Sequence, residues 1–314
     1  LYKSTLKEYA TVSLEMGYHN LFFPGGTRSR SGAVEEQLKK GLLGTALRAY
    51  ANNLRDGRDA KVFVVPCSLS FPLVLEASTL IDDYLKREGK ARYIIVDDEF
   101  SETRTILGFL KRMMAFDDPV HVVFGQPMDL MGNPVNAEGV SHDPQGRPIE
   151  RLSYVTDRAG AVVEDSQRDR VYTDRLGQKL IEAWHRDTTA LPTHIAAFAA
   201  WAILSVRHPE LDAYRLVRLD ASNRTMPRTH FLTAIARTVR HLQDLQANGR
   251  VRLGTPLDPE AIAAQALKQF SSFHSVPALQ MLNGEVHASM ELTLYYRNRL
   301  SNFGLNEQAI GAAP

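Results

Sequence analysis

The chain has 314 residues, of which 44% are hydrophobic, so it can bury the cores of one to three domains. With 37 Lys and Arg against 36 Asp and Glu, its formal net charge is +1, and no overall basic field attracts nucleic acid or anionic lipid. A single cysteine, Cys67, excludes an intrachain disulfide and fits a reducing compartment.

Residues 1–150 are predicted to form an α/β domain. An amphipathic helix that ends near Gly17 comes first and is followed by the end of a buried strand over residues 20–23. The next helix is expected over about 35–54, where two helical glycines, Gly41 and Gly44, predict close packing against a sheet. Later strands are expected over 61–71, 93–96 and 120–124, with a helix over about 102–114. Strands that alternate with helices favour a mostly parallel sheet flanked by helices.

Residues 151–314 are predicted to form a second, mainly helical domain, which follows a long loop over 129–148 that is rich in glycine and proline. Helices are expected over 149–165, 168–187, 194–206 and 227–247, and from Asp258-Pro259 and Met290 onward. Asn283-Gly284 predicts a type I′ turn in a small β-hairpin. No internal repeat is expected, and the longest apolar run, 191–204, is shorter than a membrane span.

Residues 22–32, FFPGGTRSRSG, form the most informative segment of the sequence. Pro24 cannot donate a strand hydrogen bond, and Gly25 and Gly26 free the backbone to turn. Arg28 and Arg30 follow directly, interleaved with hydroxyl groups. The hydroxyls belong to Thr27, Ser29 and Ser31. Two guanidinium groups and several short donors suit a phosphate monoester, although an exposed turn with solvated arginines has the same composition.

The same segment resembles the third sequence block of the glycerolipid acyltransferases, F-[PV]-E-G-[TG]-R-S, and its continuation is closest to the glycerol-3-phosphate acyltransferase branch. Five further segments are similar to that branch and follow in the same order. They are KKGLL at 39–43, VPCSLSF at 65–71, VFGQP at 123–127, RDT with LPTH at 186–194, and YYRN at 295–298. The resemblance therefore covers nearly the whole chain.

The resemblance implies an O-acyltransferase that moves a fatty acyl group from acyl-CoA or acyl carrier protein to glycerol 3-phosphate in phospholipid biosynthesis. It implies no metal or prosthetic group, no nucleic-acid partner, and peripheral contact with the cytoplasmic face of a membrane. The residues that it assigns to the acceptor phosphate are Arg28, Arg30, Lys39, Ser29 and Thr27. It assigns Pro24, Gly25 and Gly26 to the motif turn, and Val65 and Pro66 to the wall of the acyl site.

Two departures from the family pattern bear on activity. None of the ten histidines has an aspartate five residues later, so the family's catalytic H-x-x-x-x-D block and its second block are both absent. Because the chain begins at Leu1 within a helical pattern, we expect an N-terminally truncated fragment that is inactive alone. The family's glutamate is Gly25 here, which removes a carboxylate from the acceptor site.

Three other functions remain open. The acceptor can instead be 1-acylglycerol 3-phosphate, since that branch shares Phe23-Pro24 and Thr27-Arg28-Ser29. A non-catalytic phosphate- or phospholipid-binding protein fits the missing block and Gly25. The order of elements expected over 227–300 also resembles a nucleic-acid-binding winged helix, although the near-zero net charge disfavours it.

Overall fold

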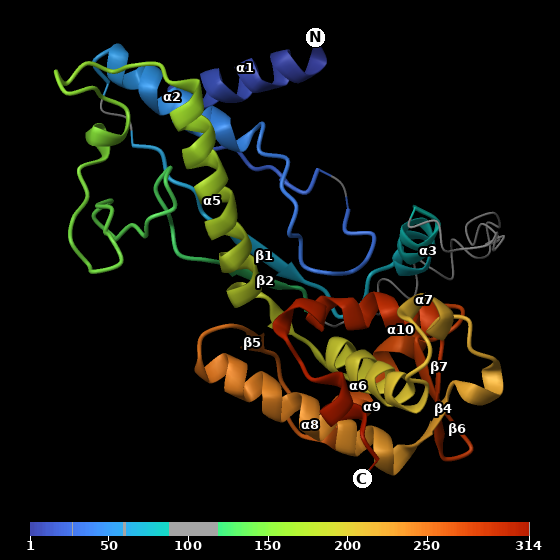
Figure 1. Cartoon of the computed structure of the whole chain (residues 1–314). Helices are drawn as coiled ribbons and strands as arrows, with labels where there is room; N and C mark the ends of the chain where they lie inside the picture. Colours follow the sequence, from blue (N-terminus) through green and yellow to red (C-terminus); the bar gives the residue numbers. More distant parts are fainter. Residues whose placement is uncertain (27, 59–60, 88–118, 314) are drawn as a thin grey trace. The chain divides into compact units, whose positions relative to one another are not determined.

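The computed structural model describes residues 1–26, 28–58, 61–87 and 119–313 (Figure 1). The chain is α/β, with helices and small sheets of two or three strands. It folds as two compact units. The first comprises residues 1–28, 35–68 and 123–184, and the second comprises 29–34, 69–122 and 185–314. The first unit thus continues across residue 150, and the domain division predicted at that residue stays a prediction.

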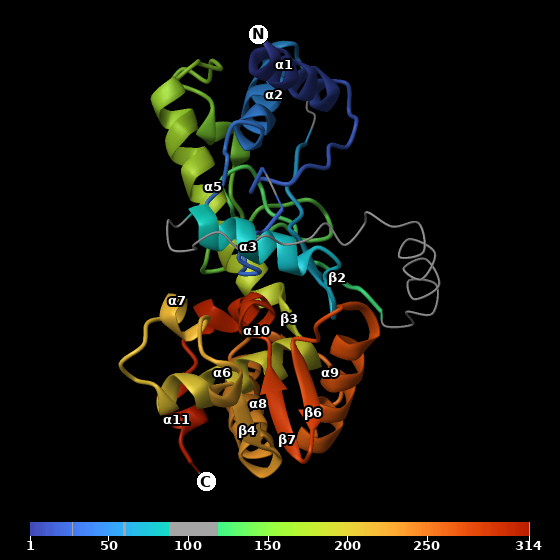
Figure 2. The ribbon, with the colours of Figure 1, turned by 90° about the vertical axis from the view of Figure 1, so that its right-hand side faces the viewer.

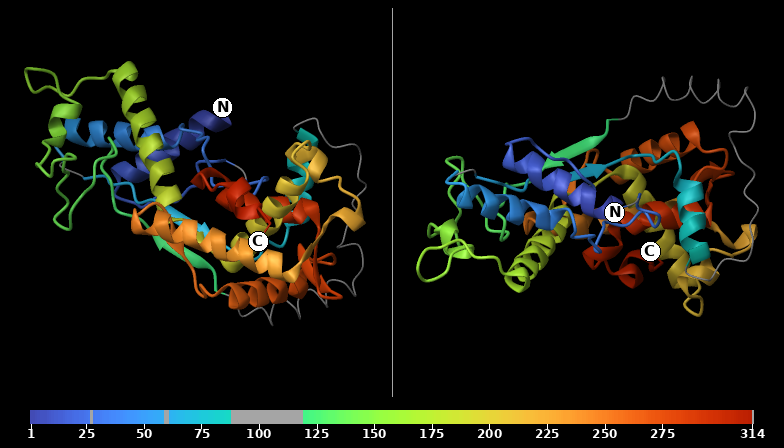
Figure 3. Two further views of the ribbon diagram at one scale, coloured as in Figure 1. Left: turned by 60° about the horizontal axis from the view of Figure 1, so that its bottom comes forward. Right: turned by 90° about the horizontal axis from the view of Figure 1, so that it is seen from above.

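In its described residues, the first unit is built from three α-helices, a short 3-10 helix and a long irregular segment. The helices are α1 (Tyr2–Glu15), α2 (Leu43–Arg55) and α5 (Ser166–Asp187), whose last residues belong to the second unit. The two blue helices α1 and α2 lie side by side (Figure 3). One face of α2, with Ala46, Leu47 and Tyr50, is buried against Leu130 and Met131 of the irregular segment. Burial of this amphipathic face stabilises the helix.

The N-terminal part of this unit differs from two of the sequence predictions. Residues 20–23 do not form a buried strand, since Leu21 is 83% and Phe23 is 71% exposed. Helix α2 begins at Leu43, not near residue 35, because residues 34–39 have no regular secondary structure and residues 40–42 form a turn. Gly44 faces Thr173 of helix α5 and not a sheet, and a Cβ at Gly44 would make only ordinary van der Waals contact with it.

A repeat of turns, which the sequence analysis missed, fills residues 129–161. The turns start at Asp129, Asn136, Asp143 and Asp157, so their spacings are multiples of seven residues. In each turn a glycine three residues later has positive φ, and the side-chain oxygen of the first residue accepts the backbone N–H four residues later. The helix expected over 149–165 is therefore wrong, and only the short 3-10 helix η1 (Arg151–Tyr154) lies there.

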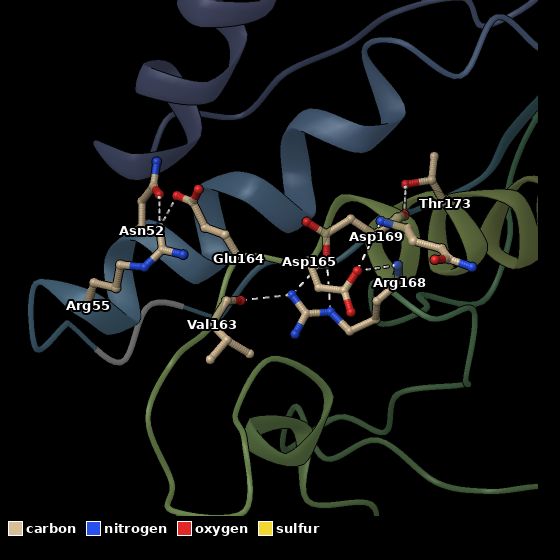
Figure 4. Close-up of polar contacts among 9 residues, drawn as sticks. Asn52, Arg55, Val163, Glu164, Asp165, Arg168, Asp169 and Thr173 are labelled. Atoms are coloured by element: carbon tan, nitrogen blue, oxygen red, sulfur yellow. Dashed lines mark hydrogen bonds and ion pairs between the residues drawn. The ribbon is translucent and has the colours of Figure 1, made fainter.

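Ion pairs hold the end of this repeat against α2 and the start of α5 (Figure 4). Arg55 of α2 lies 3.1 Å from Glu164, and Arg168 of α5 donates to Asp169 at 2.8 Å and to the Val163 carbonyl at 3.1 Å. The Arg168 side chain is mostly buried, so its contacts contribute more than an exposed pair does. These contacts determine where α5 leaves the irregular segment.

The second unit is mainly helical and is arranged around α6 (Pro192–Arg207). Residues 192–204 of α6 are all buried, and the later helices pack against this helix. Among its described residues, the other helices are α3 (Ala77–Arg87), α7 (Ala213–Leu216), η2 (Ala221–Asn223), α8 (Arg228–Ala247), α9 (Pro259–Phe273), α10 (Met290–Arg297), η3 (Asn298–Phe303) and α11 (Glu307–Gly311). The neighbouring orange helices α8 and α9 are visible in Figure 3. The mainly helical C-terminal region that the sequence predicts is consistent with this arrangement.

The strands form small sheets. The strands β4 (Thr225–Pro227), β7 (Glu285–Ala288) and β6 (Leu279–Leu282) lie side by side and antiparallel (Figure 2). The predicted hairpin is confirmed, because Asn283 and Gly284 join β6 to β7 with φ of 51° and 83°. The predicted start of α9 is also confirmed, since the Asp258 carboxylate accepts the Ala261 N–H at 2.9 Å.

The remaining strands form two pairs. β3 (Thr189–Ala190) and β5 (Arg252–Leu253) are parallel, and β1 (Cys67–Ser70) pairs with β2 (His121–Phe124). A mostly parallel sheet stays a prediction, since the strand expected over 93–96 and the helix over 102–114 lie outside the described residues. No helix in the described ranges is both long enough and apolar enough to cross a bilayer.

Two glycines of the turn repeat provide a stability test. Gly132 and Gly146 have φ of +82° and +79°, but a Cβ on Gly132 would lie 2.7 Å from Lys179 Cγ, whereas one on Gly146 has no neighbour within 4 Å. We expect Gly146→Ala to lower the free energy of unfolding by about 1–2 kcal/mol. Gly132→Ala should lower it further, because Lys179 must move. Urea denaturation measures both, and equal losses would show that the turn does not pack against α5.

A buried histidine predicts how stability depends on pH. His194 accepts the Leu191 N–H through Nδ1 at 3.2 Å, and burial together with the charge of Arg299 lowers its pKa to about 3. The folded state therefore holds neutral histidine where the unfolded chain binds a proton. Stability should fall by about 1.4 kcal/mol per pH unit below about pH 6.5. In His194→Asn, which keeps an acceptor but does not titrate, urea denaturation should show a shallower fall; an identical slope would contradict this assignment.

Candidate functional site

The glycine turn of the motif is closed by Lys39, a residue fifteen positions after Pro24. The Lys39 N–H donates to the Pro24 carbonyl at 2.7 Å, and the Gly26 N–H donates to the Phe23 carbonyl at 3.0 Å. The Lys39 side chain also lies against Gly26, since a Cβ there would be 2.5 Å from Lys39 Cδ and 2.7 Å from Nζ. With φ of +72°, Gly26 is favoured by its backbone, and a side chain there would displace the end of the Lys39 side chain. The structure brings Lys39 to the motif turn, and its role in phosphate binding stays a prediction.

The arginines of the motif belong to different units. Exposed Arg28 ends a segment of the first unit, whereas Arg30 lies in the second. Arg30 Nε lies 3.7 Å from the Asp83 carboxylate on α3, and its side chain is 26% exposed. Thr27 lies outside the described residues. Joint binding of one phosphate by Arg28, Arg30 and Lys39 therefore stays a prediction.

The Ser29 side chain forms a hydrogen bond within the arginine segment, residues 29–34. Its hydroxyl donates to the Ala33 carbonyl at 3.0 Å, and the Ala33 N–H donates to the Ser31 hydroxyl at 3.3 Å. Gly32 has φ of +80°, and a Cβ there would lie 2.2 Å from the Tyr295 carbonyl oxygen. This segment therefore has a tight local turn and touches the chain near Tyr295.

The C-terminal segment Tyr295–Arg299 holds two earlier parts of the second unit. The Asn298 amide donates to the Ser31 carbonyl at 2.8 Å, while the Tyr296 hydroxyl accepts the Val74 N–H at 3.1 Å. Arg299 donates to the Leu69 carbonyl. Burial raises the pKa of the Tyr296 phenol, so Tyr296 stays neutral. The sequence analysis matched YYRN to the family but missed these contacts, because a hydrogen bond across more than 200 residues leaves no periodic signal.

Two other matched segments lie together in the first unit. The Pro66 carbonyl accepts the Gly125 N–H at 2.8 Å, which joins the VP segment to the FGQP segment. Pro66 is buried, whereas Val65 is 48% exposed. Exposure of Val65 is compatible with a wall that contacts an acyl chain, but this role stays a prediction for both residues.

Comparisons with known proteins do not extend the motif resemblance. Searches found no matching protein-family model and no matching curated protein. The functional argument therefore depends on the motif residues and on the contacts that they make in the structure.

The bond from Asn298 to Ser31 can be tested by an isosteric change. Asn298→Asp keeps the oxygen that accepts from Arg297 at 3.0 Å but loses the donor to the Ser31 carbonyl. We expect this loss to cost about 1–3 kcal/mol and to speed amide hydrogen exchange across residues 29–34. Asn302→Asp, an exposed change in the same 3-10 helix, is the matched control. Equal exchange in both variants would show that Asn298 does not hold the arginine segment.

Proposed function

We propose that this chain carries the acceptor-binding part of an O-acyltransferase, which moves a fatty acyl group from a thioester to a hydroxyl of glycerol 3-phosphate. The observation that carries the proposal is the return of Lys39 to the Pro24–Gly26 turn, with a 2.7 Å backbone hydrogen bond. It supports the proposal because the turn and the lysine belong to different matched segments. The contact between Pro66 and Gly125 supports it in the same way.

In this function, the two motif arginines and Lys39 bind the phosphate of the acceptor. Arg28 and Arg30 supply planar guanidinium forks that match phosphate oxygens, and Lys39 adds a flexible ammonium. Phosphate binding positions the acceptor hydroxyl for attack on the thioester carbonyl, which releases the thiol of acyl-CoA or acyl carrier protein. The proposal includes a mostly parallel sheet in the acyltransferase domain and peripheral contact with the cytoplasmic face of a membrane.

The reaction also needs a general base to remove the proton of the hydroxyl. The family's base, the histidine of H-x-x-x-x-D, has no counterpart among these 314 residues. The proposal therefore assigns to them the binding of the acceptor and not the proton transfer.

The two phosphate-binding alternatives predict different ligands. An enzyme for 1-acylglycerol 3-phosphate should bind that lysolipid more tightly than glycerol 3-phosphate, because the acyl chain adds apolar contact. A non-catalytic phosphate-binding protein should bind inorganic phosphate as tightly as glycerol 3-phosphate. The order of elements in the winged-helix alternative fits, but the charged residues of α9 are only Lys268 and Glu260. The helix therefore has no net positive charge to attract a nucleic-acid backbone.

Removal of either arginine should weaken binding of the phosphorylated acceptor. By isothermal titration with glycerol 3-phosphate, Arg28→Ala and Arg30→Ala should each raise Kd about 10- to 150-fold, because a charge-assisted hydrogen bond contributes about 1.5–3 kcal/mol. Lysine at either position should restore little, since an ammonium lacks the bidentate fork.

Arg58→Ala is the control, because Arg58 is a half-exposed arginine of the first unit that pairs with Asp56 outside the motif. Wild-type Kd in both motif variants, or an equal loss in the control, would contradict phosphate binding at the motif.

A further inference from the structure

A carboxylate fills the space beside Gly25. A Cβ built on Gly25 would lie 2.6 Å from Glu35 Oε2 and 3.2 Å from Glu35 Cδ. Gly25 does not have a φ in the left-handed region, so its backbone does not demand glycine. A side chain at position 25 would therefore point into the volume that the Glu35 carboxylate occupies.

The backbone around Glu35 fixes this arrangement within the first unit. Glu35 Oε1 accepts the Gln37 N–H at 3.0 Å, and two residues later the Lys39 N–H reaches the Pro24 carbonyl. Residues 35–39 thus cross the Pro24–Gly26 turn, with Glu35 over Gly25 and Lys39 over Gly26. The bond to Gln37 uses Oε1, so Oε2 is the oxygen nearest to Gly25.

We propose that Glu35 supplies the acidic group of the acceptor site, in place of the side chain that Gly25 lacks. This inference rests on the proposed function. An ionised carboxylate only accepts hydrogen bonds, so it suits the hydroxyl groups of a glycerol moiety and repels a phosphate. Lys39, whose side chain lies against the next glycine of the turn, Gly26, provides the positive charge for the phosphate. Glu35 and Lys39 together distinguish glycerol 3-phosphate from inorganic phosphate.

The test compares two ligands in isosteric variants. Glu35→Gln keeps the size of the side chain and removes its charge. We expect it to raise the Kd of glycerol 3-phosphate about 10-fold or more, the loss expected for a hydrogen bond to a charged group. The Kd of inorganic phosphate should stay the same or fall, because a repelling charge is gone. Glu36→Gln removes a neighbouring exposed carboxylate and is the matched control.

Moving the carboxylate provides the rescue experiment. The double variant Gly25→Glu with Glu35→Ala should restore the preference for glycerol 3-phosphate, because alanine at position 35 frees the volume beside position 25 and the φ of Gly25 suits a side chain. A purely structural Glu35 would not be rescued in this way. Melting temperatures identify misfolded variants, and Glu35→Asp, which retains the charge, then replaces Glu35→Gln and should weaken only the glycerol-containing ligand.

Equal changes in the Kd of both ligands, no change in either, or no rescue would overturn the role of Glu35. Arg30→Ala separates this failure from failure of the proposed function. If Arg30→Ala weakens binding of both ligands and Glu35→Gln changes neither, then only the inference about Glu35 is wrong. If Arg30→Ala also changes neither, the proposed acceptor site is wrong as well.

Discussion

The backbone hydrogen bond from Lys39 to Pro24 is the constraint on which the candidate site depends. At 2.7 Å it closes the chain between the glycine turn and the residues before α2. Residues 35–39, which make this contact, have no regular secondary structure, and α2 starts only after the turn at 40–42, at Leu43. The same bond carries the side chains of Glu35 and Lys39 over the two glycines. One backbone contact thus accompanies the placement of both charges beside the motif turn.

The arginine segment depends on a different constraint, supplied by the C-terminal residues of the second unit. Gly32 allows the backbone to approach Tyr295, and Asn298 donates to Ser31. The hydroxyl of neighbouring Tyr296 accepts a hydrogen bond from the Val74 N–H. The side chains of the YYRN segment therefore form hydrogen bonds with backbone groups more than 200 positions earlier. These contacts explain physically why the YYRN segment, near the C-terminus, bears on the arginine segment near the N-terminus.

Local signals in the sequence predicted much of this structure. The Asp258 cap and the Asn283-Gly284 turn are confirmed because each depends on a few adjacent residues. The strand over 20–23 was wrong because apolar residues there are exposed. The helix over 149–165 was wrong because a repeat of turns, spaced by seven or fourteen residues, extends into this range, and it became clear only from the hydrogen bonds.

The candidate site shows the same limit. The sequence singles out the motif turn and Lys39, because both lie in recognisable segments, and their binding role stays a prediction. Glu35 does not, because no short-range pattern says that residues 35–39 cross the turn. The split of Arg28 and Arg30 between two units is also invisible in a sequence where they are two residues apart. Long-range backbone contacts, and not side-chain composition, decide these points.

The most direct test of the account is a crystal structure of the chain with glycerol 3-phosphate. The account predicts the phosphate group within hydrogen-bond distance of the Arg28 and Arg30 guanidinium groups and the Lys39 ammonium, with a glycerol hydroxyl on Glu35. A phosphate bound elsewhere, or a site at the motif that stays empty at a saturating concentration of the ligand, would contradict it.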